Sequence, residues 1–234
     1  MPAPPRQPKH SGYGLRRLVL PVALVAALTL AAVGWLTRLD QPAAIPHHAV
    51  AGTVQADVLT PDQVSKLVGT ALVSGPSVSK PPAELIVDPS SCAVAAGPAT
   101  QSVYGHGWSA FLSTTYQNPA GVGEVTVTQV IGVYSDGDKA DSVFRTLSDG
   151  LKACPFAVRT DPDRGTSAWA YKADPATQDT LGWTATQDTG DGWACYGQAR
   201  LKGKAVIQVG LCEAGDGKPA ATKIADQFAA KVNG

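Results

Sequence analysis

Four cysteines are the residues of this 234-residue chain whose spacing says most about its chemistry. Cys195 and Cys212 flank Lys202-Gly203-Lys204-Ala205, which has glycine at the first central position, as a two-residue type II′ hairpin loop requires. Opposite residues of that hairpin have numbers that sum to 407, as Cys195 and Cys212 do, unless a β-bulge shifts the count. Cys195 and Cys212 form a non-hydrogen-bonded pair of the antiparallel ladder. The Cα atoms of such a pair lie ~4.5 Å apart, a distance that a disulfide can span. We therefore predict a Cys195–Cys212 disulfide.

The remaining cysteines, Cys92 and Cys154, then pair by elimination. All four lie beyond a hydrophobic segment, which indicates a disulfide framework in an oxidising compartment. In the chain-entropy treatment the two ring closures stabilise the fold by ~3 and ~4 kcal/mol. A zinc site is the alternative, but no two cysteines have zinc-ligand spacing and only His106 could assist. We predict no metal site.

Candidate catalytic residues are few. His106 is the only histidine after residue 56, so a Ser-His-Asp arrangement would depend on it. It lies between Gly105 and Gly107, where a surface imidazole is the ordinary outcome. Disulfides leave no thiolate, and no two carboxylates are paired as glycoside hydrolysis requires. We predict a protein without enzymatic activity or cofactor, and we rank a hydrolase using His106 last.

Aromatic and glutamine side chains in and beside the predicted strands indicate a binding site instead. Most such aromatic residues belong to a core or a sheet face. A cleft that combines some of them with glutamines would suit a small ligand. The candidate lining residues are Trp108, Tyr116, Gln129, Gln187, Trp193 and Gln208.

The N-terminal part of the chain predicts a membrane anchor. Residues 1–17 are proline-rich without apolar periodicity, so we expect a disordered cytoplasmic tail. Residues 18–37 carry no charge and are long enough to span ~30 Å of hydrocarbon. Four basic residues precede this segment, so the positive-inside rule places the N-terminus in the cytoplasm and everything after the helix outside. A cleaved signal peptide is the alternative, although its apolar core is usually shorter.

Residues 38–56 are predicted to be a linker, and residues 57–234 an extracytoplasmic domain. The His47-His48 pair could bind a metal, but no third ligand is near, so a solvated linker is favoured. Five of the 19 basic residues precede the first acidic residue, Asp40, which leaves fourteen against 19 acidic ones. This excess of negative charge argues against a nucleic-acid partner.

Capping residues and periodicity predict the elements of the domain. Thr60, Pro61 and Gln63 open a helix that Gly69 closes. An amphipathic helix is expected from an N-cap at Ser135 to residue 154, a short one at 92–96 and a last one after residue 219. Residues 73–87 are expected to be largely irregular, with a short strand at 84–87. The remaining strands are predicted at 107–117, 124–134, 155–160, 167–172, 181–187 and in the hairpin within 187–214.

This order of elements predicts an α+β fold. We expect a central antiparallel sheet with helices packed on one side, two disulfides, and a single transmembrane helix before the domain.

Several motifs of the domain together resemble the PknH-like extracellular sensor domains of actinobacterial envelope proteins. The resemblance covers about residues 58–232. It is carried by LTPDQVSKLVG, Asp88-x-x-x-Cys92, Gly107-Trp108, Lys152-Ala153-Cys154, Gln187-x-x-Gly190-x-Gly192-Trp193-x-Cys195 before Cys212, and Ile224-Ala225-x-x-Phe228-Ala229-x-Lys231-Val232. It implies an α+β fold, the disulfide pairing given above and a cleft for an unidentified ligand. The sequence shows no kinase domain and no lipobox cysteine, so the helix at 18–37 would be its anchor.

Topology, disulfides and resemblance together predict a single-pass membrane protein with a sensing or ligand-binding domain facing the cell wall. Its ligand would be a small molecule, a lipid or a cell-wall fragment. The alternative is a structural or assembly partner of another envelope protein, which would use an exposed sheet edge or apolar patch.

Overall fold

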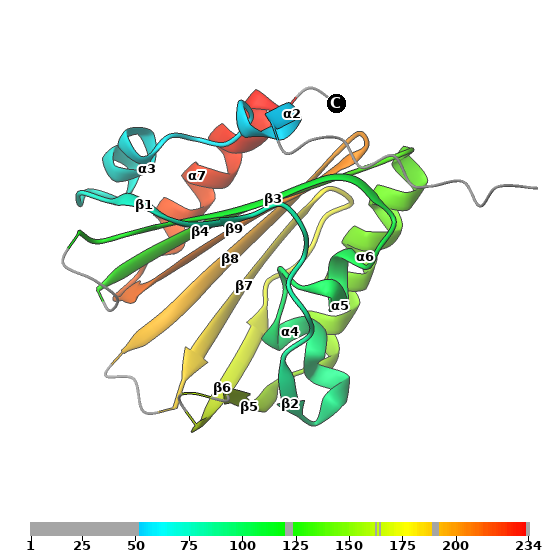
Figure 1. The fold of residues 1–234 in the computed structure, drawn as a ribbon. Helices are drawn as coiled ribbons and strands as arrows, with labels where there is room; N and C mark the ends of the chain where they lie inside the picture. Colours follow the sequence, from blue (N-terminus) through cyan, green and yellow to red (C-terminus); the bar gives the residue numbers. More distant parts are fainter. Residues whose placement is uncertain (1–51, 120–123, 162, 164, 189–191, 233–234) are drawn as a thin grey trace, which may run out of the picture. The chain divides into compact units, whose positions relative to one another are not determined.

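A computed structural model describes residues 52–119, 124–161, 163, 165–188 and 192–232 of the chain. Their elements, in chain order, are α2 (Gly52–Gln55), α3 (Pro61–Val68), β1 (Val73–Val78), β2 (Ile86–Asp88), η1 (Ser90–Cys92), α4 (Ala93–Ala96), α5 (Gln101–Tyr104), β3 (Trp108–Gln117), β4 (Val125–Tyr134), α6 (Gly137–Ala153), β5 (Phe156–Asp161), β6 (Gly165–Ala173), β7 (Thr180–Gln187), β8 (Trp193–Lys202), β9 (Ala205–Ala214) and α7 (Lys218–Lys231) (Figure 1). The expected α+β class is confirmed. The predicted tail and transmembrane helix lie outside the described residues, and no helix within the described ranges is long and apolar enough to cross a membrane.

The strands form one nine-stranded antiparallel sheet in the order β1-β3-β4-β9-β8-β7-β6-β5-β2. The β8–β9 hairpin occupies its centre and has the predicted register, because Lys202 pairs with Ala205 and Cys195 with Cys212 without a shift between them. Gly203 has a φ of 55°, the left-handed conformation that the predicted turn requires. The Cys195 and Cys212 Cα atoms lie 3.9 Å apart, and both predicted disulfides are confirmed.

Helices cover both faces of the sheet, so the predicted one-sided packing is wrong. One face carries α4, α5 and α6 and is called the α6 face below; the other carries α2, α3 and α7 and is called the α7 face (Figure 1). Alternate residues of one strand belong to different cores: Val130 of β4 joins the α6 face, whereas Val127 and Ile131 join the α7 face. A strand buried on both sides needs a helical layer on each.

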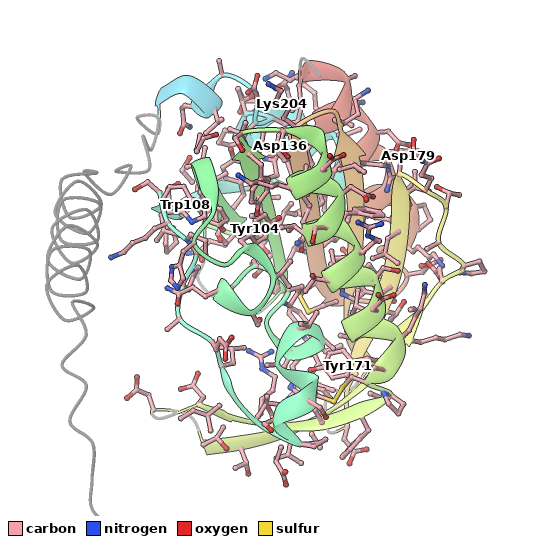
Figure 2. All side chains as sticks on the ribbon, turned by 90° about the vertical axis from the view of Figure 1, so that its right-hand side faces the viewer. Tyr104, Trp108, Asp136, Tyr171, Asp179 and Lys204 are labelled. Atoms are coloured by element: carbon pink, nitrogen blue, oxygen red, sulfur yellow. A yellow bond between two sulfur atoms is a disulfide. The ribbon has the colours of Figure 1, made fainter. Side chains whose placement is uncertain are left out.

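Helix starts follow local hydrogen bonding. At α3 the predicted capping box is present, since Thr60 accepts from the Gln63 N–H and the Gln63 side chain accepts from the Thr60 N–H. At α6 the N-cap is Asp136 rather than the predicted Ser135, because the Asp136 carboxylate accepts from the Lys139 N–H at 2.9 Å. This bond, together with one donated by Ser135, lowers the pKa of Asp136, which lies at the top of α6 in Figure 2.

Three elements lie where the sequence pattern indicated none. β1 is an edge strand in the segment expected to be irregular, and four residues separate α5 from the end of α4. α2 lies within the predicted linker, and Val54 is buried in the core of the α7 face. The two helices α2 and α5 have four residues each, too few to show a period, and β1 contains Gly75 and Pro76, which are uncommon in strands.

The backbone of Leu59 is held in the α7-face core by two buried side chains. The Gln129 amide oxygen accepts from the Leu59 N–H at 3.0 Å, and its nitrogen donates to the Leu59 carbonyl at 3.1 Å. The Tyr116 hydroxyl donates to the same carbonyl at 2.7 Å. Burial raises the pKa of Tyr116, so this hydroxyl stays a donor. Together they fix the segment that leads into α3.

We expect Gln129→Met to lower the free energy of unfolding by about 1–3 kcal/mol, because it leaves the buried Leu59 N–H without a partner at nearly constant side-chain volume. Urea denaturation measures the loss. Gln227→Met, at an exposed position of α7, is the control and should stay within about 0.5 kcal/mol of the parent protein. Equal losses in the two variants would contradict the role of Gln129.

Candidate ligand-binding cleft

Three of the six predicted lining residues do not meet at a cleft. Tyr116 and Gln129 lie on the α7 face, where they hold Leu59. Trp108 packs beside Phe111 with ring centroids 6.1 Å apart, near Tyr104 in Figure 2, and it lines neither hollow described next. Their side chains serve the fold.

Two adjoining hollows lie along the sheet: residues of β2 and of β5 to β8 line the outer cleft, and residues of β4 to β9 line the inner pocket. The outer cleft has a volume of about 510 Å³, and the predicted residues Gln187 and Trp193 line it. The inner pocket has a volume of about 210 Å³ and lies between the sheet and the α4 segment; the predicted Gln208 lines it. Arg159 and Trp169 line both hollows, so the two spaces share a wall.

Strand register brings the lining residues to the α6 face. Directly opposite residues of neighbouring antiparallel strands point to the same side of a sheet. Such pairs connect the hollows strand by strand: Arg159 with Ser167, Trp169 with Gln187, Ala185 with Cys195, and Gly197 with Gly210. The wall is therefore a row of side chains from five consecutive strands of the sheet.

The floor of the inner pocket is shaped by two opposed glycines. A Cβ atom on Gly197 would lie 1.9 Å from the ring of Trp183, so the indole lies directly over Gly197. A Cβ atom on Gly210 would meet no atom within 4 Å, so this position leaves the floor open. The Cys195–Cys212 disulfide flanks the glycine pair and lines the same pocket.

The roof of the inner pocket is the α4 segment, with Ala95, Ala96, Pro98 and Ala99. The Cys92–Cys154 disulfide joins the start of this segment to the end of α6. Gly150 lets α6 approach closely, because a Cβ atom there would lie 2.4 Å from Val94. Gln208 joins the floor to the roof by donating to the Pro98 carbonyl at 2.9 Å.

Arg159 gives the shared wall a positive charge, and Tyr171 gives the inner pocket a hydroxyl without a described hydrogen-bond partner. The Arg159 guanidinium lies 5.4 Å from the centroid of the Trp169 ring, and no described carboxylate lies within 4.0 Å of it. Tyr171 is 8% exposed, lies next to α4 in Figure 2, and its hydroxyl has no hydrogen-bond partner among the described residues. Burial raises the pKa of Tyr171 against the opposing effect of Arg159, so the phenol remains protonated.

These hollows offer apolar contact, hydrogen bonding, the Arg159 guanidinium and, in the outer cleft, the carboxylates of Glu84 and Asp161. His106 is exposed and lines neither of them. Within the described ranges, no three His, Cys, Asp or Glu residues are grouped so that they could hold a metal ion. The arrangement can bind and orient a small molecule.

Arg159, Trp169 and Tyr171 were not among the predicted site residues. Their strands were predicted, and Trp169 and Tyr171 alternate with small or polar residues as a one-face pattern requires. Neither the segment between β5 and β6 nor that between β6 and β7 has the sequence of a two-residue hairpin turn, so the sequence does not reveal the register that pairs Arg159 with Ser167 and Trp169 with Gln187.

An antiparallel sheet with helices on both faces and two disulfides defines a disulfide-stabilised α+β domain. The sequence model of the PknH-like extracellular domain family matches residues 49–231, so the chain belongs to this family and the predicted resemblance is confirmed. The crystal structure of the extracellular domain of PknH from Mycobacterium tuberculosis matches with a TM-score of 0.71 and 20% identity, over 80% of this chain and 98% of that one. This structural similarity shows that the two domains share a fold. No curated protein sequence gives a significant match.

We expect Gly197→Ala to destabilise the protein by about 1–3 kcal/mol, because its Cβ atom would overlap the Trp183 ring. Gly210→Ala, at the opposite position of the same strand pair, has open space and should change the melting temperature little. Differential scanning calorimetry compares the two variants. Equal melting temperatures would show that Trp183 does not lie over Gly197.

Proposed function

We propose that this chain is a membrane-anchored, non-enzymatic sensor domain that binds a ligand outside the cytoplasmic membrane. The observation that carries the proposal is the pair of adjoining hollows between a floor and a roof that disulfides hold. Membership of an extracellular domain family supports the location. The apolar segment at 18–37 supplies the anchor, with residues 1–17 in the cytoplasm.

The outer cleft has the size and composition of a small-molecule site. Its volume of about 510 Å³ falls in the usual range for ligand pockets. Trp169 and Trp193 offer flat apolar surfaces, while Gln187 and Arg159 offer hydrogen-bond donors. The ligand is therefore a small molecule, a lipid or a cell-wall fragment rather than a nucleic acid.

The sheet edges do not favour the alternative of an assembly partner. β1 contains Pro76, and its pairing with β3 shifts register between Ser74 and Ser77. The other edge, β2, is three residues long. Prolines, irregular pairing and short strands all protect an edge from pairing with another chain.

Surface labelling of intact cells tests the proposed topology. A membrane-impermeant amine reagent should modify exposed lysines such as Lys80 and Lys172 without lysis, and the protein should sediment with membranes. Labelling that appears only after lysis would place the domain inside the cell. A labelled protein whose mature N-terminus lies between residues 44 and 53 would show that the anchor is cleaved.

A thermal-shift panel of soluble peptidoglycan fragments and lipids tests ligand binding. We expect at least one compound to raise the melting temperature, because a ligand that binds only the folded state stabilises it. Gln187→Ala should weaken that binding by about two- to tenfold, as loss of one hydrogen bond predicts. Gln178→Ala, exposed in the β6–β7 loop, is the control. A panel without any stabilising compound would contradict the proposed function.

A further inference from the structure

We propose that the ligand is a single-chain acidic amphiphile, whose apolar group fills the inner pocket and whose carboxylate or phosphate lies at Arg159. This inference rests on the proposed ligand-binding function and specifies the ligand class. The two hollows differ in chemistry and share one wall, so a molecule that spans them needs one apolar and one polar end.

The inner pocket fits the apolar end. Its lining is mainly aromatic rings, alanines and the Cys195–Cys212 disulfide, with Trp169 and Trp183 the largest side chains. An apolar cavity of about 150 Å³ is enough to bind benzene. A pocket of about 210 Å³ therefore has room for one apolar group somewhat larger than a benzene ring. It is too small for the two chains of a phospholipid and too apolar for a sugar ring.

Arg159 fits the acidic end. Of the charged residues that line the hollows, it alone lines both, whereas Glu84 and Asp161 line only the outer cleft. No carboxylate in the described part of the chain lies within ion-pair distance of its guanidinium. A guanidinium binds carboxylate or phosphate through two parallel hydrogen bonds. An acid at the junction of the hollows would therefore meet the guanidinium of Arg159.

The hydroxyl of Tyr171 is the second independent pointer to a ligand. Tyr171 is more than nine-tenths buried, lines the inner pocket, and has no partner for its hydroxyl among the described residues. Leaving such a group unsatisfied costs about 1–3 kcal/mol. Arg159 and Tyr171 line the same inner pocket, so a ligand held there would face both the guanidinium and the unpartnered hydroxyl.

Isothermal titration with octyl phosphate tests the inference. The full chain is held in lipid nanodiscs, and empty nanodiscs titrated in parallel give the background from partition into lipid. We expect octyl phosphate to bind at least about tenfold more tightly than octanol, which lacks the charge, or ethyl phosphate, which lacks the chain. Octanoate should resemble octyl phosphate, because a guanidinium accepts either acid.

Two variants with matched controls locate the two ends of the ligand. Gly210→Val places apolar atoms in the open floor of the inner pocket, and Arg159→Gln removes the charge; each should weaken octyl phosphate binding about tenfold or more. Ala170→Val, at an exposed position of β6 that lines neither hollow, and Arg145→Gln, on the exposed side of α6, should bind like the parent protein. An unchanged melting temperature without ligand shows that each variant is folded.

The outcomes separate this inference from the proposed function. Equal affinity for octanol and octyl phosphate, or undiminished binding by Gly210→Val or Arg159→Gln, would overturn the inference. If peptidoglycan fragments bind and Gln187→Ala weakens them while octyl phosphate does not bind, the inference fails and the sensor function stands. If neither class binds, both fail.

Discussion

The register of the β8–β9 hairpin is the constraint on which the rest of this domain depends. The hairpin lies at the centre of the sheet, so its register sets which residues of β8 and β9 face α6 and which face α7, and the neighbouring strands pair with these two. A slip by one residue would exchange the two faces and separate Cys195 from Cys212. The turn at Gly203 and the disulfide specify the same register from opposite ends of the hairpin.

Much of the fold could be predicted because hairpin register, capping boxes and cysteine pairing are local rules. The number of helical layers could not. Residues such as Thr128 and Gly132 in β4 resemble a solvent-facing side, yet they lie under the α6 layer. A Cβ atom on Gly132 would lie 2.6 Å from the Tyr104 ring, so a small residue here marks close approach of an aromatic ring. Composition alone does not distinguish a small residue that lies under an aromatic ring from one that is exposed to solvent.

The candidate site could be predicted only in part, for the same reason. Residue type identified Gln187, Trp193 and Gln208, but it assigned the same role to Tyr116 and Gln129, which lie on the opposite face. The strand register decides to which side of the sheet a residue points. A loop without a defined turn type does not reveal that register. Arg159, Trp169 and Tyr171 belong to strands joined by such a loop, so their convergence required the structure.

The disulfides make the shape of the candidate site depend on an oxidising compartment. Cys195–Cys212 lies in the floor of the inner pocket, and Cys92–Cys154 ties down the segment that forms its roof. Floor and roof are further joined through Gln208 and Pro98. A pocket held in this way is preorganised, so little conformational entropy is lost when a ligand enters. An oxidising environment outside the membrane is thus a condition for the shape of the site as well as for the stability of the fold.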